Sequence, residues 1–352
     1  TGQCDPDIVV YREESADIRI LNTSLTLDQD GSPHIVYNLI DVRSYENEWE
    51  RPSEVWYTRK NTAGTWQRLK LGDEAYQPNI AWSYSITDTQ GYLHIGWETH
   101  NPPLNGASDF NGYIRYHRCP DNSEEEGNIT CPESYININY QPAGTHPRPA
   151  ITANGEDVQL FWSRCTSLDL NPPCERLSLL YQRSTDGGDN FTDPQEVLSN
   201  QQINSEIYKY HGTDDESEEY DFYLRPAAVA NDEGLPIVAW QVENPDYDGG
   251  YTITTTLVTS ATENTLTWKE TGWSEGNGYD LRVNPVVALP PSGQEEEGMH
   301  LVFMQSDGAY GTFQIYYSYF GTELFVEPTP TPTDDEDNRT YVYLPLVMQS
   351  HP

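Results

Sequence analysis

A recurring block of strand-like segments constrains the fold of this chain more than any other feature of its sequence. Each block opens with an Arg or Gln close to a short apolar run, passes through a Gly-containing or acidic turn, and continues into two strands rich in aromatic residues. In the first block these parts are residues 19–21, 28–31, 33–37 and 55–59. A single block cannot bury its apolar face alone, so neighbouring blocks must pack against one another.

Five such blocks predict an all-β fold: a β-propeller of about five four-stranded blades plus a C-terminal extended tail. Radial packing of four-stranded sheets protects the edges of the sheets. We place one propeller domain at residues 1–325, with repeats at roughly 17–73, 74–140, 145–200, 220–272 and 279–325. Six blades result if the flanking strands, such as residues 8–12, form a further sheet. A stacked solenoid or a pair of sandwiches is the alternative architecture.

The charge of the chain excludes several classes of partner. Nineteen basic and 56 acidic residues give a formal net charge of −37. Phosphate binding needs clustered Lys and Arg, so nucleic acid and anionic membrane surfaces are not expected as partners. No apolar run approaches the roughly 18 residues that a membrane span requires. We expect a highly soluble, self-repelling surface.

Calcium is the cofactor that the acidic residues suggest. Asp28-x-Asp30-Gly31 and Asp246-x-Asp248-Gly249 resemble fragments of calcium loops. Neither fragment has the downstream Glu of an EF-hand, so each can equally be a simple turn. No other cofactor is expected.

Five cysteines and four glycosylation sequons point to an extracellular or cell-surface location. Cys119 and Cys131 flank one polar segment, and Cys165 and Cys174 flank another, which favours the disulfides 119–131 and 165–174. Cys4 is then free or linked to another chain. Disulfides require an oxidising compartment. The sequons, which are compatible with glycosylation, begin at Asn22, Asn128, Asn190 and Asn338.

One turn in the third block carries a family resemblance. Residues 184–191 read Ser-Thr-Asp-Gly-Gly-Asp-Asn-Phe. They resemble the Asp box, Ser-x-Asp-x-Gly-x-x-aromatic, of the BNR repeats in sialidase-like propellers, matched here by Ser184, Asp186, Gly188 and Phe191. The resemblance implies a structural role, in which the Asp caps backbone N–H groups and the aromatic packs between sheets. Residues 61–66 and 264–268 look like eroded copies.

The same resemblance suggests a ligand site. Sialidases bind a substrate carboxylate with three arginines, because a planar guanidinium grips a carboxylate at two points. Arg148, Arg225 and Arg282 begin successive innermost strands, and Arg19 is a fourth candidate. The alternative is that each Arg pairs with a neighbouring carboxylate. No Tyr/Glu pair and no catalytic Asp of the family can be matched, so the catalytic residues are unknown.

Three histidines recur at one position of the second strand: His34, His94 and His300. A metal-binding ring of histidines is conceivable, but the third and fourth blocks have Gln159 and Pro236 there. Alternation also places each histidine on one face of its own blade. We therefore interpret them as repeated structural histidines.

The composition changes after residue 325. Residues 326–340 form a Pro/Thr-rich acidic linker, and residues 341–352 contain a lone apolar strand with Tyr-Leu-Pro-Leu at 343–346. This ending resembles those of secreted proteins from some filamentous bacteria, which implies a surface-attachment element. A lone strand needs a partner edge. Residues 341–348 are expected to join another copy or a cell-wall component, or to fold back onto their own propeller.

These features favour a non-catalytic, secreted or cell-surface β-propeller. It would act as a self-assembling structural subunit or as a module that binds glycans or proteins. The alternative is a secreted sialidase-like glycoside hydrolase that uses Arg148, Arg225 and Arg282.

Overall fold

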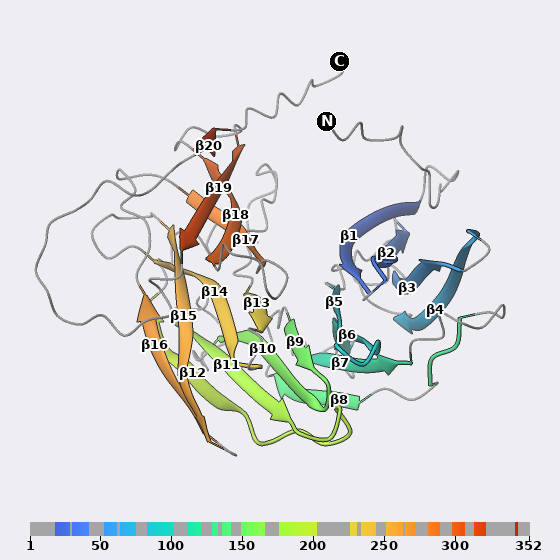
Figure 1. Cartoon of the computed structure of the whole chain (residues 1–352), viewed down its shortest axis with the longest axis horizontal. Helices are drawn as coiled ribbons and strands as arrows, with labels where there is room; N and C mark the ends of the chain where they lie inside the picture. Colours follow the sequence, from blue (N-terminus) through green and yellow to red (C-terminus); the bar gives the residue numbers. More distant parts are fainter. Residues whose placement is uncertain are drawn as a thin grey trace, which may run out of the picture. The chain divides into compact units, whose positions relative to one another are not determined.

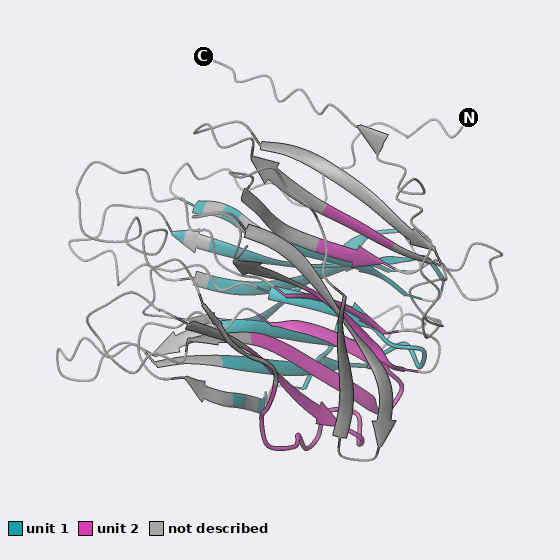
Figure 2. Cartoon of the chain, turned by 90° about the vertical axis from the view of Figure 1, so that its left-hand side faces the viewer, with its two compact units in different colours: residues 1–143 teal, residues 144–352 magenta. Residues whose placement is uncertain are grey.

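The fold was analysed in a computed structural model of the whole chain. The structure describes residues 18–28, 30–41, 53–61, 64–74, 83–101, 111–120, 129–132, 136–141, 149–165, 176–202, 226–230, 234–243, 251–262, 265–271, 281–288, 298–306, 313–321 and 342–343. The described residues are all-β and contain twenty strands (Figure 1). No described helix is long and apolar enough to cross a bilayer. The chain divides into two compact units, residues 1–143 and 144–352 (Figure 2).

The first unit contains two antiparallel sheets of four strands, each in simple up-and-down order. The strands of the first sheet are β1 (Ile18–Leu27), β2 (Pro33–Asp41), β3 (Ser53–Lys60) and β4 (Trp66–Glu74). Those of the second sheet are β5 (Ser83–Thr87), β6 (Leu93–Asn101), β7 (Asn111–Cys119) and β8 (Ile136–Gln141).

The second unit begins with a third four-stranded sheet and continues with a larger one. The third sheet contains β9 (Ala150–Asn154), β10 (Asp157–Cys165), β11 (Arg176–Ser184) and β12 (Gln195–Gln202). The fourth group contains β13 (Ala227–Ala230), β14 (Pro236–Glu243), β15 (Tyr251–Thr262) and β16 (Thr265–Thr271). The fifth group contains β17 (Leu281–Ala288), β18 (Gly298–Ser306), β19 (Phe313–Gly321) and β20 (Val342–Tyr343). One parallel bridge, Tyr251 to Leu281, joins these two groups into a single eight-stranded sheet.

The middle strands are apolar because both of their faces are covered. In the third sheet, the consecutive residues Leu160, Phe161 and Trp162 of β10 are all fully buried. Leu179 and Leu180 of the neighbouring β11 are buried as well. Such continuous runs are typical of strands with packing on both sides.

Within the first unit, the two sheets pack through both apolar and hydroxyl side chains. Val36 and Tyr57 of the first sheet share a core cluster with Ile95 and Trp97 of the second. Nearer the first strands, hydroxyl groups connect β1 to β5. Ser24 Oγ accepts a hydrogen bond from the backbone N–H of Ser85 at 2.9 Å, and Thr26 and Thr87 are linked in the same way at 3.2 Å.

The second unit repeats this arrangement of first strands. β9 lies beside β13, and β13 lies beside β17. The side chain of Gln159 on β10 donates to the carbonyl oxygen of Gly234, just before β14, at 2.9 Å. Successive groups in each unit are thus joined at their first strands, which is the relationship expected between neighbouring blades of a propeller.

The end of the chain returns to its own last group of strands. Val342 pairs with Tyr317, and Tyr343 with Tyr316, so β20 is an antiparallel neighbour of β19 (Figure 1). Residues 342–343 thus pair with the chain's own sheet, and attachment of residues 341–348 to another copy or to a cell-wall component stays a prediction. The linker, residues 326–340, lies outside the described residues.

Candidate functional site

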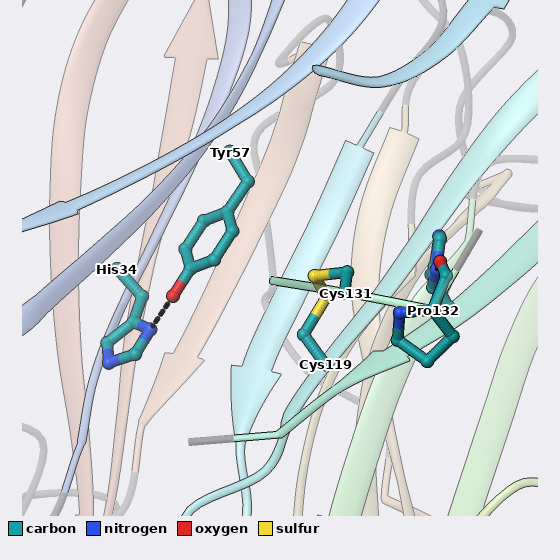
Figure 3. The surroundings of a disulfide bond; sticks show 6 residues. His34, Tyr57, Cys119, Cys131 and Pro132 are labelled. Atoms are coloured by element: carbon teal, nitrogen blue, oxygen red, sulfur yellow. Dashed lines mark hydrogen bonds between the residues drawn. A yellow bond between two sulfur atoms is a disulfide. The ribbon is translucent and has the colours of Figure 1, made fainter. Parts of the chain in front are cut away.

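Two buried chains of Asp, His and Tyr are the most chemically capable clusters among the described residues. In the first sheet, His34 lies 2.7 Å from the hydroxyl of Tyr57 through Nδ1 and 3.3 Å from Asp28 Oδ2 through Nε2. Figure 3 shows the ring of His34 pointing toward Tyr57. A carboxylate can only accept, so Nε2 carries a proton; in a neutral ring, Nδ1 then accepts a hydrogen bond from the tyrosine hydroxyl.

The second sheet repeats this chain. His94 Nδ1 lies 2.6 Å from the hydroxyl of Tyr116, and His94 Nε2 lies 3.1 Å from Asp88 Oδ2. In both sheets the Asp precedes the His by six residues, and the Tyr lies on the next strand. The two chains are therefore one structural feature that occurs in two repeats.

The Asp of each chain also closes the turn between the first and second strands. Asp28 Oδ1 accepts hydrogen bonds from the backbone N–H groups of Asp30 and Ser32, at 3.0 and 2.7 Å. Asp88 Oδ1 accepts equivalent bonds, both 2.8 Å long, from residues 90 and 92. Each turn contains a glycine with positive φ, +77° at Gly31 and +86° at Gly91, a conformation that side chains with a Cβ rarely adopt.

Burial keeps the second chain in its neutral-histidine form. Burial lowers the pKa of His94, and the hydrogen bond that His94 donates to Asp88 only partly offsets this. Burial raises the pKa of Asp88, but the hydrogen bond from His94 and those from the turn lower it more, so the net shift is downward. The histidine is neutral and the aspartate is ionised at neutral pH.

The order of these groups, a hydroxyl next to a base next to a carboxylate, is the order that activates a nucleophile in many enzymes. The burial of these side chains argues against a role in activating a nucleophile. The side chains of His94 and Asp88 are both 0% exposed, and Tyr116 is 1% exposed. A substrate cannot reach the tyrosine oxygen, so the chain fixes the turn against the third strand. These contacts agree with a structural role for His34 and His94. His300 lies on β18 opposite Ala288.

The Asp-box turn of the third sheet is held by its own hydrogen bonds. Asp186 Oδ1 accepts from the backbone N–H of Asn190 at 2.9 Å, and Ser184 Oγ accepts from that of Gly188 at 2.8 Å. Hydrogen bonds from Ser184 and Asn190 lower the pKa of Asp186 to about 2. The side chain of Phe191 is half-buried. The turn thus has the capping bonds that a structural role requires.

A simpler version of this turn joins β3 to β4. Asn61 Oδ1 accepts from the backbone N–H of Thr65, four residues on, at 2.8 Å, as Asp186 does from Asn190. The two turns thus share one capping bond, and the interpretation of residues 61–66 as an eroded copy stays a prediction. The other eroded copy, residues 264–268, includes a residue outside the described part of the chain.

The predicted calcium fragments have different outcomes. Both oxygens of Asp28 are engaged by protein donors, namely two backbone N–H groups and His34. Asp28 therefore acts as a turn cap, and the side chain of Asp30 is exposed. Among the described residues there is no group of three or more His, Cys, Asp or Glu side chains arranged to hold a metal. Asp246 and Asp248 lie outside the described residues.

The predicted arginine cluster is described only in part. Arg148 and Arg225 lie outside the described residues. Arg19 lies on β1 opposite Ile40, and Arg282 lies on β17 opposite Gln305; both precede an irregularity in their strand pairing. The backbones of Arg19 and Arg282 thus occupy similar places in two different sheets, and the cluster itself stays a prediction.

One predicted disulfide is confirmed. Cys119, at the end of β7, is bonded to Cys131 (Figure 3). Ile129, inside the closed loop, is buried with the core of the first unit, and His117 Nε2 donates to the carbonyl oxygen of Pro132. Cys174, the partner expected for Cys165, lies outside the described residues, as does Cys4.

Glycosylation stays a prediction at each sequon. The side-chain amide of Asn190 donates to Asp186 Oδ2 at 2.7 Å, within the Asp-box turn. Asn128 and Asn338 lie outside the described residues, and the side chain of Asn22 is not described.

The sequence matches no protein-family model and no curated protein. Among solved structures, a protein of unknown function from Dyadobacter fermentans matches with a TM-score of 0.53 and 12% identity, over 96% of this chain and 85% of that chain. An N-acetylgalactosamine deacetylase from F. plautii, in complex with blood group B trisaccharide, matches with a TM-score of 0.50 and 12% identity, over 90% of this chain and 93% of that chain.

Sialidases are also among the structural matches. The sialidase from Streptococcus pneumoniae matches with a TM-score of 0.47 and 10% identity, over 82% of this chain and 53% of that chain. This chain therefore spans about half the length of that sialidase. The sialidases and arabinanases among the matches are β-propeller glycoside hydrolases. At these identities the likeness concerns the fold alone.

Proposed function

We propose that this chain is a non-catalytic, secreted or cell-surface β-propeller of about five blades that binds glycans and assembles through its C-terminal strand. One observation carries the non-catalytic part. The two Asp–His–Tyr chains have the residue types of a nucleophile-activating site, yet His94 and Asp88 are 0% exposed and serve a turn. The hydrogen bonds of these groups instead fix the turn between the first two strands against the third strand.

A glycan is the ligand that the comparisons suggest. The deacetylase that shares this fold binds blood group B trisaccharide, and its match covers 90% of this chain. The predicted arginines suit an acidic sugar, because a guanidinium can grip a carboxylate at two points. We propose Arg148, Arg225 and Arg282, with Arg19 as a fourth, as the residues that bind it.

A glycan array tests this part of the proposal. The full chain is applied to immobilised sialylated, arabinose-containing and blood group B oligosaccharides. We expect binding to an acidic glycan that falls at least tenfold in Arg282→Lys, since Lys keeps the charge but loses the two-point contact. Lys60→Ala, at an exposed position on β3, is the matched control and should bind normally.

A sialidase-like hydrolase is the second candidate. The similar positions of Arg19 and Arg282 at the starts of their sheets favour it, because sialidases bring arginines from several blades to one substrate. Fluorogenic sialosides separate the two candidates. Turnover that is lost in Arg282→Lys would replace the non-catalytic proposal, whereas binding without turnover supports it.

Assembly is the remaining part of the proposal. The disulfide Cys119–Cys131 fits an oxidising, extracellular compartment. The net charge of −37 makes copies repel one another, so assembly needs a specific attachment. Light scattering on the full chain over a concentration series should detect oligomers. A monomer at every concentration would remove assembly from the proposal and leave glycan binding untouched.

A further inference from the structure

The fifth group of strands obtains its fourth strand differently from the others. In the first four groups the fourth strand follows the third over residues 61–65, 120–135, 185–194 and 263–264. In the fifth group, residues 322–341 separate β19 from β20, and they contain the alternating Pro-Thr run 328–333. β20 is also the shortest strand, with two residues. Among the described fourth strands, this one thus follows the longest intervening segment.

Among the described residues, β20 pairs with only part of the outer edge of β19. β19 has nine residues, and its described pairing with β20 involves Tyr316 and Tyr317 alone. A strand edge presents N–H and C=O groups that can pair with any extended segment of suitable sequence. Pro345 follows β20 closely and has no N–H to give, which limits how far the pairing can extend toward the C-terminus.

The linker is much longer than pairing within one chain requires. Antiparallel neighbours can be joined by about two to five residues. Fully extended, residues 322–341 could reach about 66 to 72 Å, at roughly 3.3 to 3.6 Å per residue. A long linker lowers the effective concentration of the chain's own strand at β19. The strand of a second copy can then compete for the same edge.

We propose that the outer edge of β19 is a strand-acceptor site that takes residues 342–343 of a second copy of this chain, in the antiparallel register seen within one chain. The proposal rests on the assembly part of the proposed function and names the site that performs it. Reciprocal exchange of the two strands closes a twofold dimer, because each copy both gives and accepts a strand. Charge repulsion opposes the approach of two copies, so added salt favours exchange.

Cross-linking between two variants that each carry one introduced cysteine tests the site. Full-length Tyr317→Cys and full-length Val342→Cys, both also carrying Cys4→Ser, are mixed and oxidised. These two positions face each other in the pairing of β19 with β20, so only exchange between copies brings them together. We expect a disulfide-linked heterodimer whose yield rises with protein concentration and with salt from 0.05 M to about 0.3 M, where screening shortens the range of repulsion.

Thr329→Cys, in the linker, replaces Val342→Cys in the matched control. A heterodimer yield at least fivefold above this control supports the proposal. A yield equal to the control would overturn it, and the single chain carrying both Tyr317→Cys and Val342→Cys would then close internally as a monomer. If light scattering still detects oligomers in that case, the assembly role stands and the β19 edge is the wrong site.

Discussion

The second and third sheets build the same connection, between their first and second strands, in different ways. In the second sheet residues 88–92 join β5 to β6, and Asp88 and His94 hold that turn. In the third sheet only residues 155–156 join β9 to β10. A two-residue connection fixes its own geometry and needs no capping side chain. Gln159 accordingly stands where the second sheet has His94.

The strand register shows that His94 and Gln159 occupy equivalent positions in their sheets. His94 lies opposite Arg118, and Gln159 lies opposite Arg183. The tyrosine two residues before that arginine is present in both sheets, as Tyr116 and Tyr181. The tyrosine therefore recurs in both sheets, whereas the histidine recurs only with the long turn. The difference teaches that the Asp–His–Tyr chain belongs to the turn and not to a catalytic centre.

Replacing the histidine should produce the largest effect. His94→Ala leaves Oδ2 of the buried Asp88 without its donor, and we expect a loss of about 2 to 4 kcal/mol in the free energy of unfolding. Gln159→Ala, the matched change in the third sheet, should cost about 1 kcal/mol, because it removes neutral hydrogen bonds. Urea unfolding measures both. Equal losses would contradict the distinction between the two sheets.

Acid should weaken the second sheet first. The folded-state pKa of His94 lies below its usual 6.5, so below pH 6.5 the unfolded chain binds a proton that the folded chain does not. Stability is therefore lost as pH falls from 6.5 toward the folded pKa, by at most about 1.4 kcal/mol per pH unit for this group. Asp88 adds a further loss below pH 3.8.

The variant His94→Gln isolates this contribution. Its unfolding free energy should change less between pH 7 and pH 5 than that of the original chain. Some dependence remains, because burial also lowers the pKa of His117. If the unfolding free energy of His94→Gln changed with pH as much as that of the original chain, this histidine would not titrate as described.

Removing the tyrosine hydroxyl should have a smaller effect. Tyr116→Phe keeps the packing but leaves His94 Nδ1 without its donor, at a cost of about 1 to 2 kcal/mol. Tyr57→Phe, the same change in the first sheet, should cost a similar amount, since its hydroxyl lies 2.7 Å from His34 Nδ1. Urea unfolding of both variants checks the equivalence. A cost in one sheet alone would break the description of the two chains as one repeated feature.

The Asp-box turn should give the smallest effect. Asp186 is exposed, so Asp186→Asn, which keeps one acceptor oxygen, should change the melting temperature by no more than a few degrees. NMR titration of the original chain should give Asp186 a pKa of about 2. A pKa near the usual 3.8 would mean that the capping bonds do not form in solution.

The sequence predicts the strands well because their signals are local. The first strand pair shows this, since the predicted runs 33–37 and 55–59 lie inside β2 and β3. The disulfide Cys119–Cys131 was also predictable, because both cysteines flank one short segment. The Asp-box turn is equally local, with its donors and acceptors within eight residues.

The Asp–His–Tyr chains were only half predicted, for a physical reason. The recurrence of His34 and His94 is visible in the sequence, but their tyrosine partners come from the next strand, whose register is set by the whole sheet. Asp28 was interpreted as part of a calcium fragment, although the spacing Asp-x-x-Gly-x-x-His is shared by residues 28–34 and 88–94. That shared spacing was the available signal. The partner edge of β20 was not predictable, because a long linker leaves several edges within reach.

The most direct test of the central claim is mass spectrometry of the glycans that the full chain retains after incubation with an acidic glycan mixture. The account predicts that specific glycans are retained and recovered intact, and that Arg282→Lys retains far less of them. Recovery of cleaved products, or retention of no glycan at all, would contradict a non-catalytic glycan-binding propeller.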